Sequence, residues 1–241
     1  MLLSEARRLV SPVLAAAVKD AGRALPGATA AFDADGTLWR DDVGEAFLKH
    51  LVALGMVKHR SGRDPFEVYE EKVAQDKATG YAWAAQAMAG LRRDDVARAA
   101  ANFAPEWVAP RLIASTQALL LLCAEAGLLT AVVSASCLEI VLAAAPIAGV
   151  PAGRCQGMTV RALRGELLEE LVPPITYAEG KVAALEKAAW LPLAVAGGDS
   201  LTGDLAMLSL ARVPVVVAPP QGSPLSAEAA RRGWTVVPQG G

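Results

Sequence analysis

Phe32-Asp33-Ala34-Asp35-Gly36-Thr37-Leu38 places two carboxylates two residues apart, directly after a short apolar run from Ala28 to Phe32. The apolar run predicts a buried strand, and the Asp-Gly pair predicts a turn at its end. Two aspartates in such a place repel each other, so both stay ionised only if a cation or hydrogen-bond donors stabilise them. The arrangement is therefore typical of a site for a metal ion and an electrophile. An ordinary Asp-Gly turn is the alternative when the segment is considered alone.

Three further segments carry polar side chains that are candidates for the same site, and two of them follow or end an apolar run. They are Leu129-Thr130-Ala131-Val132-Val133-Ser134, an apolar run that ends in a hydroxyl; Glu179-Gly180-Lys181; and Gly197-Gly198-Asp199-Ser200-Leu201-Thr202-Gly203-Asp204, which follows the apolar run Leu193 to Ala196. In an open parallel sheet, ligands bind beyond the carboxyl ends of the strands. We therefore expect Asp33, Ser134 and Asp199 to lie in one crevice.

Short strand-like runs alternate with helical patterns along most of the chain. The expected strands are Ala28 to Phe32, Leu129 to Val133, Leu193 to Ala196, Val213 to Ala218 and Thr235 to Val237. The expected helices are Pro110 to Ala126, Glu139 to Ala145, Glu179 to Ala189 and Gly203 to Ala211. Glycines punctuate short extended pieces in residues 155–171, which we interpret as a strand and a small hairpin. The alternation predicts an α/β fold, with helices on both faces of a parallel sheet.

Taken in order, these segments resemble the four motifs of the haloacid dehalogenase superfamily. Asp33-Ala34-Asp35-Gly36-Thr37 resembles the first motif, Ser134 the end of the second, Lys181 the third, and the run from Gly198 to Asp204 the fourth. The resemblance extends from about Ala28 to Val217. It implies a three-layer, Rossmann-like parallel sheet with an inserted α-helical cap.

The cap is expected in the insertion between the first and second motifs. Residues 45–107 are helical in pattern throughout and rich in aromatic residues, and an insertion of this length is too large for a loop. We therefore expect a core of residues 1–44 and 108–241 and a helical cap of residues 45–107. In the superfamily, a cap at this place is associated with small-molecule substrates. His50 and His59 in this region are interpreted as surface or hydrogen-bonded histidines, not as ligands or bases.

The resemblance also implies a role for each carboxylate. Asp33 corresponds to a nucleophile that forms an aspartyl-phosphate, which divides one difficult displacement into two easier steps. Asp35 corresponds to the acid/base that protonates the leaving alkoxide and then deprotonates the attacking water. Asp33, the backbone carbonyl of Asp35 and Asp199 correspond to Mg²⁺ ligands, with Asp204 as an orienting carboxylate nearby. A divalent ion held by carboxylates would balance the charge of the phosphoryl oxygens.

Four residues correspond to the phosphate-binding groups of the superfamily, namely Thr37, Ser134, Ala135 and Lys181. Ser134 is expected to donate to a phosphoryl oxygen, helped by the backbone amide of Ala135 at a helix start. Lys181 is expected to supply a fixed positive charge, and a solvated lysine on a helix is the alternative. Asp35 together with Thr37 favours phosphomonoester hydrolysis over the dehalogenase, phosphonate hydrolase and sugar phosphomutase branches.

The expected function is therefore Mg²⁺-dependent hydrolysis of a small phosphomonoester through an aspartyl-phosphate. Within the phosphatases, the helical insertion, Ser134-Ala135-Ser136 and the segment from Val172 to Lys181 most resemble the phosphoserine and phosphorylcholine phosphatase branch. Two alternatives remain open. One is a phosphotransferase of the same fold that passes the group to an alcohol, and the other is a non-catalytic module that binds a small ligand or a partner. The intact set of motif residues disfavours the second.

Substrate recognition is expected close to the first motif. Phosphoserine phosphatases carry a glutamate shortly after this motif that contacts the substrate amine, and the same spacing here gives Asp42, with Glu45 nearby. Trp39 and Phe47 are candidates for an aromatic wall against an ammonium group, and core packing is the alternative for Trp39. An amine-bearing phosphoester, such as phosphoserine, phosphorylcholine or phosphoethanolamine, is the expected substrate class.

Composition and charge are typical of a soluble enzyme. The chain has 241 residues, 54% hydrophobic and 20% charged, so it is long enough to bury a large core. Its formal net charge of −2 comes without a basic run, which argues against nucleic-acid binding. Cys123, Cys137 and Cys155 lack metal-ligand spacing and are expected to be buried thiols in a reducing compartment. Pro12 splits the N-terminal apolar run, so we expect an amphipathic helix rather than a secretion signal, no membrane span and a cytoplasmic location.

Overall fold

The computed structural model describes residues 1–58, 61–219 and 221–239, so His59 lies outside the described residues. Its centre is a six-stranded sheet in the order β3-β2-β1-β6-β7-β8, in which each paired neighbour runs parallel. The strands are β1 (Thr29–Phe32), β2 (Leu129–Cys137), β3 (Cys155–Met158), β6 (Leu193–Gly198), β7 (Val213–Ala218) and β8 (Thr235–Pro238). A separate antiparallel hairpin consists of β4 (Val160–Leu163) and β5 (Glu166–Leu171). The predicted parallel α/β sheet is confirmed, as is the strand with a hairpin in 155–171.

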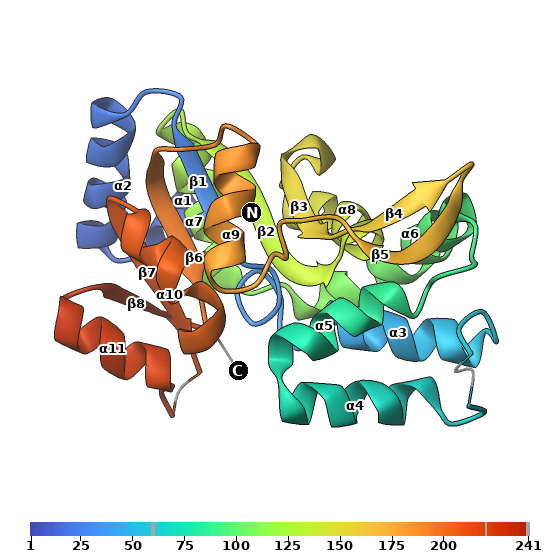
Figure 1. The fold of residues 1–241 in the computed structure, drawn as a ribbon. Helices are drawn as coiled ribbons and strands as arrows, with labels where there is room; N and C mark the ends of the chain where they lie inside the picture. Colours follow the sequence, from blue (N-terminus) through green and yellow to red (C-terminus); the bar gives the residue numbers. More distant parts are fainter. Residues whose placement is uncertain (59–60, 220, 240–241) are drawn as a thin grey trace.

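Helices cover both faces of this sheet and make it the middle of three layers (Figure 1). On one face lie α2 (Pro12–Ala24) and α7 (Ala114–Glu125), with α1 (Leu3–Leu9) against α7; on the other lie α9 (Glu179–Lys187), α10 (Leu201–Leu210) and α11 (Pro224–Arg232). Each face has its own buried apolar cluster. β1 is central and covered on both sides, and its four residues are all buried. This burial explains why Ala30, Ala31 and Phe32 are apolar in succession and do not alternate with polar residues.

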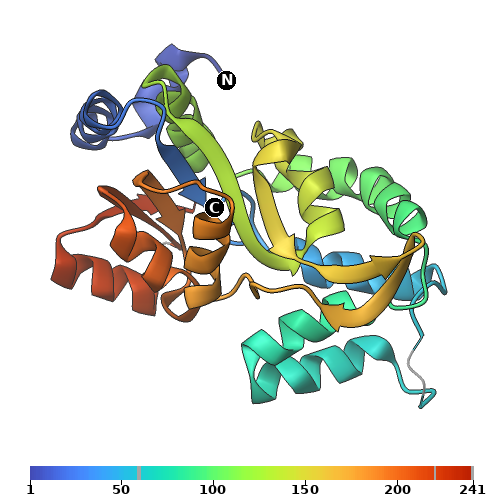
Figure 2. The same cartoon turned by 45° about the horizontal axis from the view of Figure 1, so that its top comes forward.

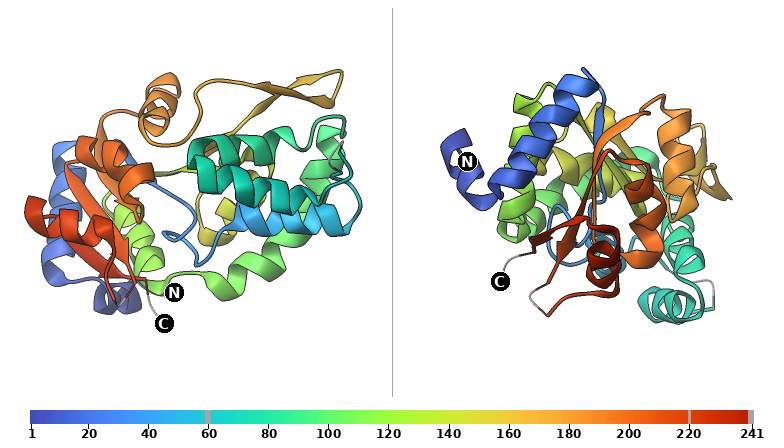
Figure 3. Two further views of the ribbon diagram at one scale, coloured as in Figure 1. Left: turned by 60° about the horizontal axis from the view of Figure 1, so that its bottom comes forward. Right: turned by 90° about the vertical axis from the view of Figure 1, so that its left-hand side faces the viewer.

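Four helices between β1 and β2 pack together beside the sheet (Figures 2 and 3). They are α3 (Val43–Ala53), α4 (Pro65–Gln75), α5 (Lys77–Gln86) and α6 (Arg93–Val108); α8 (Leu138–Ala144) packs against α6, and short 3₁₀ helices span Ala109–Arg111, Ala145–Ala148 and Ala152–Arg154. The β4–β5 hairpin joins this group. The amide of Gly90 donates to the Leu167 carbonyl (2.8 Å), and the amide of Leu167 donates to the Leu91 carbonyl (2.9 Å). Residues distant in sequence therefore complete the helical side of the molecule.

β2 is longer than the sequence predicted, and its length corrects one expectation about the site. The strand continues through Cys137, and α8 begins at Leu138. Pairing with β3 extends the strand, because Cys137 lies opposite Met158 after an irregularity in the register. Ala135 therefore lies within a strand, and the expectation that its amide is at a helix start is wrong.

The N-terminal apolar run forms helices α1 and α2, which are separated by Val10 and Ser11, directly before Pro12. The Ser11 side chain caps α2 by accepting from the amide of Leu14, and Pro12 occupies the first helical position. Leu14 is buried whereas Val13 is exposed, as expected for an amphipathic helix. The cysteines Cys123, Cys137 and Cys155 are buried and free, as predicted. Among the described residues, we find no helix with both the length and the apolar character needed to cross a bilayer.

Candidate active site

Asp33 follows β1 at the point where the strand order changes direction. β2 and β3 lie on one side of β1, and β6, β7 and β8 lie on the other. The Asp33 amide donates to the Gly197 carbonyl on β6 (2.9 Å), and the amide of Leu38 closes the following loop by donating to the Ala34 carbonyl (2.7 Å). Ligands of open α/β sheets bind at such a switch point. The loop that carries Asp33 and Asp35 is thus fixed at the usual ligand-binding edge of the fold.

Lys181 extends from the first turn of α9 into a buried group of charges. Its Nζ contacts Oδ1 of Asp33 and lies 2.6 Å from Oδ1 of Asp204. Burial lowers the pKa of the Lys181 ammonium, but the negative charges of Asp204 and Asp33 outweigh burial and raise it. The start of α9 is tightly packed, because a Cβ at Gly180 would lie 1.6 Å from the Ile175 carbonyl oxygen. Lys181 is therefore a permanent cation between two carboxylates.

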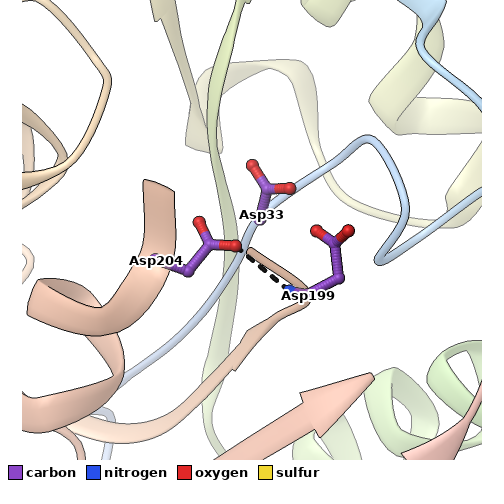
Figure 4. A group of neighbouring side chains, drawn as sticks. All are labelled: Asp33, Asp199 and Asp204. Carbon is purple, nitrogen blue, oxygen red and sulfur yellow. Dashed lines mark hydrogen bonds between the residues drawn. The ribbon is translucent and has the colours of Figure 1, made fainter. Parts of the chain in front are cut away.

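Three carboxylates converge beside this lysine (Figure 4). Asp33, Asp199 after β6 and Asp204 in the first turn of α10 each place one oxygen within 4.8 Å of the others. Both oxygens of Asp204 already have partners, since Oδ1 contacts Lys181 and Oδ2 accepts from the Asp199 amide (3.1 Å). Asp204 therefore orients the loop and the lysine. Asp33 and Asp199 are left as the carboxylates that fit a bound cation.

The pKa values of Asp33 and Asp199 indicate that their surroundings lack positive charge. Burial, reinforced by repulsion from Asp204, raises the pKa of Asp33 to about 7. Burial, reinforced by repulsion from Asp33, raises the pKa of Asp199 to about 8. A cation would relieve this repulsion, and carboxylate oxygens are the hard ligands that Mg²⁺ prefers. The residues present therefore fit a Mg²⁺ ion.

Asp35 is held by hydrogen-bond donors from three elements. Nε1 of Trp39 (2.8 Å) and the amide of Val43 at the start of α3 (2.7 Å) donate to Oδ1. The hydroxyl of Ser136 on β2 donates to Oδ2 (2.7 Å). Burial, with repulsion from Asp42, raises the pKa of Asp35 to about 7, although these hydrogen bonds act in the opposite direction. A carboxyl group that changes protonation near neutral pH suits an acid/base.

Thr37 and Ser134 have no exposed surface and are bonded to the carboxylates of the site. Oγ1 of Thr37 donates to Oδ1 of Asp199 (3.3 Å). Oγ of Ser134 lies 3.5 Å from Oδ2 of Asp35 and accepts from the amide of Ser136 (3.0 Å). Both hydroxyls therefore orient carboxylates in this structure. Their direct contact with a phosphoryl oxygen stays a prediction.

A cavity of about 660 Å³ borders the carboxylates and Lys181, whereas Thr37 and Ser134 are not among the described residues that line it. Asp33, Asp35 and Asp199 line it from the core, while Lys77 and Tyr81 line it from α5. Ligand pockets for small molecules have volumes of about 300–1,000 Å³. The cavity therefore suits a small molecule held between the sheet and the helical group.

A much smaller chamber of about 20 Å³, roughly the size of one water molecule, adjoins this cavity and shares Asp42, Tyr81, Ala135 and Ser136 as walls. Two of the residues expected to contact the substrate, Glu45 and Phe47, line it, together with Tyr69 and other apolar side chains. Asp42 caps α3 by accepting from the Glu45 amide (2.8 Å), and burial raises its pKa. The chamber thus combines carboxylates with aromatic rings.

Trp39 is not among the described residues that line the main cavity or the smaller chamber. Its side chain has no exposed surface, and its indole Nε1 is bonded to Asp35. Of the two interpretations of Trp39, the structure therefore supports core packing, because the ring is buried and bonded to the Asp35 carboxyl instead of forming an aromatic wall.

Several cavity residues were missed by the sequence analysis. Ser136 carried a usable signal, since it lies two residues after Ser134 and alternate residues of a strand share a face. Tyr81 and Tyr177 carried none, because their rings meet only in the fold, with centroids 5.6 Å apart at 63°. The hydroxyl of Tyr177 donates to that of Thr202 (2.8 Å), so these contacts connect α5 with the α10 side of the core.

The sequence matches the model of the haloacid dehalogenase-like hydrolase family over residues 30–209. The chain belongs to this family. The matched region includes every carboxylate of the site from Asp33 to Asp204, together with Lys181. The predicted superfamily is therefore confirmed. Among curated proteins, none matches the sequence significantly.

Solved structures share the fold at low sequence identity. A protein of unknown function from Bordetella pertussis Tohama I is 20% identical, with a TM-score of 0.74 over 88% of this chain and 99% of its own. A substrate-bound phosphoserine phosphatase is 15% identical, with a TM-score of 0.58 over 87% of this chain and 92% of its own. A phospho-aspartyl intermediate analogue of phosphoserine phosphatase is 14% identical, with a TM-score of 0.57 over 88% and 93%. The Rossmann-like fold of the superfamily is thus shown.

Proposed function

We propose that this haloacid dehalogenase-like hydrolase is a Mg²⁺-dependent phosphatase that cleaves a small phosphomonoester through an aspartyl-phosphate on Asp33. The observation that carries the proposal is the convergence of Asp33, Asp35, Lys181 and Asp199 on one cavity. Stability alone does not call for four charged groups with perturbed pKa values around such a space. The fold shared with phosphoserine phosphatases supports a phosphoester as substrate.

In the first step, an oxygen of Asp33 attacks phosphorus and the bond to the leaving oxygen breaks. Lys181 contacts Oδ1 of Asp33 and so holds this carboxylate at the edge of the cavity. The buried ammonium also reduces the repulsion between this carboxylate and an anionic phosphoryl group. Asp35 gives its proton to the leaving alkoxide, which departs as the alcohol.

In the second step, water attacks the phosphorus of the aspartyl-phosphate. Asp35, now ionised, accepts a proton from this water as the new bond forms. The bond between phosphorus and Asp33 breaks, inorganic phosphate leaves, and both aspartates return to their starting states. One carboxyl group can serve both steps because its pKa of about 7 lies near neutral pH.

Asp33 and Asp199 would hold Mg²⁺ with their side chains, and we assign the backbone carbonyl of Asp35 as a further ligand. When bound, the ion would supply positive charge to the phosphoryl oxygens. Thr37 and Asp204 orient Asp199, one of these metal ligands. Thr37 donates to the carboxylate of Asp199, and Asp204 accepts from its backbone amide.

We further propose that residues 45–107 act as a cap on a core of residues 1–44 and 108–241. Lys77 and Tyr81 of this region line the main cavity, and Phe47 and Tyr69 line the adjoining chamber. Asp42 adds a half-buried carboxylate where the two spaces meet. Asp42 and Tyr81 also line the main cavity, and an aromatic face and a carboxylate both stabilise an ammonium group, which supports an amine-bearing phosphoester as substrate.

A panel of phosphomonoesters assayed with Mg²⁺ tests this function. We expect release of inorganic phosphate from phosphoserine, phosphorylcholine or phosphoethanolamine in preference to neutral sugar and nucleoside phosphates. Assays with and without an added acceptor alcohol separate a hydrolase from a phosphotransferase, because transfer to the alcohol lowers the yield of free phosphate. No turnover of any phosphomonoester in the presence of Mg²⁺ would favour a non-catalytic binding module.

A further inference from the structure

We propose that Trp39 is a positioning residue that acts through Asp35. Its indole fixes the acid/base carboxyl so that Oδ2, and not Oδ1, exchanges the proton with the reacting group. The inference rests on the proposed function, because it takes Asp35 to be the group that protonates the leaving oxygen. It adds a role for a residue that lines neither cavity.

The two oxygens of Asp35 have chemically different partners. Oδ1 faces two N–H groups, Nε1 of Trp39 at 2.8 Å and the amide of Val43 at 2.7 Å. An N–H group of this kind donates but cannot accept, so neither partner can receive a hydrogen bond from a proton on Oδ1. Oδ1 is therefore occupied as an acceptor throughout the reaction.

Oδ2 faces hydroxyl groups instead. Oγ of Ser136 lies 2.7 Å from it, and Oγ of Ser134 lies 3.5 Å from it. A hydroxyl can donate to a carboxylate and accept from a carboxylic acid, so these partners tolerate both states of Asp35. Ser136 also lines the main cavity, which places Oδ2 on the side that a substrate occupies.

Trp39 is well suited to hold this orientation. Its side chain has no exposed surface, and its backbone carbonyl accepts from the Gly36 amide (2.9 Å) within the same loop. The indole therefore cannot rotate away without disturbing buried packing. Val43, the other donor to Oδ1, belongs to α3. Trp39 and Asp35 lie on one loop and are paired through an isolated β-bridge. The loop thus carries both the acid/base and the donor that orients it.

Trp39→Phe tests the inference, because it removes the N–H donor and keeps an aromatic ring. With an alkyl phosphate, we expect kcat to fall roughly 10- to 100-fold, the effect of losing a hydrogen bond to a charged group, with little change in KM. With an activated aryl phosphate, whose leaving group needs less protonation, the loss should be clearly smaller. Trp190→Phe is the matched control. Trp190 is partly buried against the cluster on the α9 side of the sheet, so its substitution should leave both rates unchanged.

A double-mutant cycle separates positioning from general support of the fold. In an Asp35→Asn background, Trp39→Phe should cause no further loss of kcat, because the indole acts through the carboxyl. If Trp39 had a purely structural role, Trp39→Phe would lower kcat equally with both substrates. It would also cause a further loss of kcat in the Asp35→Asn background. Either result would overturn the inference. If Trp39→Phe does not fold, benzothienylalanine at position 39 offers the same comparison, since it keeps the ring shape and replaces the N–H with sulfur.

The same cycle distinguishes this inference from the proposed function. Asp35→Asn can lower kcat more with the alkyl phosphate than with the aryl phosphate while Trp39→Phe lowers kcat equally with both. In that case only the role of Trp39 is refuted. If Asp35→Asn lowers both rates equally, the acid/base assignment fails and the role of Trp39 fails with it.

Discussion

Lys181 and Asp204 form a fully buried ion pair, with 2.6 Å between Nζ and Oδ1. Their side chains are 2% and 0% exposed, and the same ammonium contacts Asp33. Removing one partner of a buried pair leaves the other charge without compensation. This lysine therefore connects the stability of the fold with the chemistry of the site.

Lys181→Met should abolish turnover and lower the free energy of unfolding by about 3–5 kcal/mol, because Asp33 and Asp204 lose their shared cation. Urea denaturation of the metal-free protein measures the change. Lys187→Met is the control, since the exposed Lys187 ammonium donates only to the Pro173 carbonyl among the bonds described. Equal stability of the Lys181 variant and the wild type would contradict the importance of the buried pair.

The metal-free protein should become less stable as the pH rises from about 5 to 8. The pKa values of Asp33 and Asp199 are raised from 3.8 to about 7 and about 8, so the folded state binds protons more tightly than the unfolded state. Stability from this source is complete below the unfolded pKa and is lost as the pH rises through the folded pKa. Thermal unfolding in chelator across this range measures the loss. The Asp199→Asn variant should show a flatter dependence on pH.

Mg²⁺ should reverse this loss, and its effect should be larger at pH 8 than at pH 5.5. Metal binding requires ionised carboxylates, so protonation of Asp33 and Asp199 competes with the ion. The shift in melting temperature on adding Mg²⁺ at the two pH values measures the coupling. A shift that is the same at both, or that persists in Asp199→Ala, would contradict the assignment of these ligands.

Asp42→Asn should raise KM for an amine-bearing phosphoester and leave that of a neutral phosphoester nearly unchanged, with kcat little affected. Asparagine can still cap α3 by accepting from the Glu45 amide, so the substitution tests charge rather than fold. Steady-state kinetics on matched amine and neutral substrates measures the difference. Glu45→Gln provides a second test of charge in the chamber. Equal weakening of both substrates by Asp42→Asn would refute an ammonium contact.

The sequence allowed much of the core to be predicted because its signals are local. Continuous apolar runs marked the central strands, and the polar residues after them were expected at one edge of a parallel sheet. Asp33 and Asp199 indeed meet there with Lys181, as their places in the motif order implied. The end of β2 was misjudged, because pairing of Cys137 with Met158 extends the strand and no local pattern announces that pairing.

The surroundings of the site were less predictable, since they depend on contacts between distant segments. The position of Trp39 after the first motif left a cavity wall and core packing as alternatives, and the fold resolves them because the buried indole is bonded to Asp35. Tyr81 and Tyr177 lie far apart in sequence and meet only when α5 packs beside the core. The β4–β5 hairpin likewise attaches to the helical group through backbone bonds, which leave no side-chain pattern to detect.

The central claim is that Asp33 is the nucleophile, and the turnover of Asp33→Asn tests it most directly. An amide cannot form the phosphoenzyme, so we predict less than about a hundredth of wild-type activity on an activated aryl phosphate, where protonation of the leaving group matters least. Circular dichroism confirms that the variant is folded, and mass spectrometry excludes reversion to aspartate. Retention of more than about a hundredth of wild-type turnover would contradict covalent catalysis by Asp33.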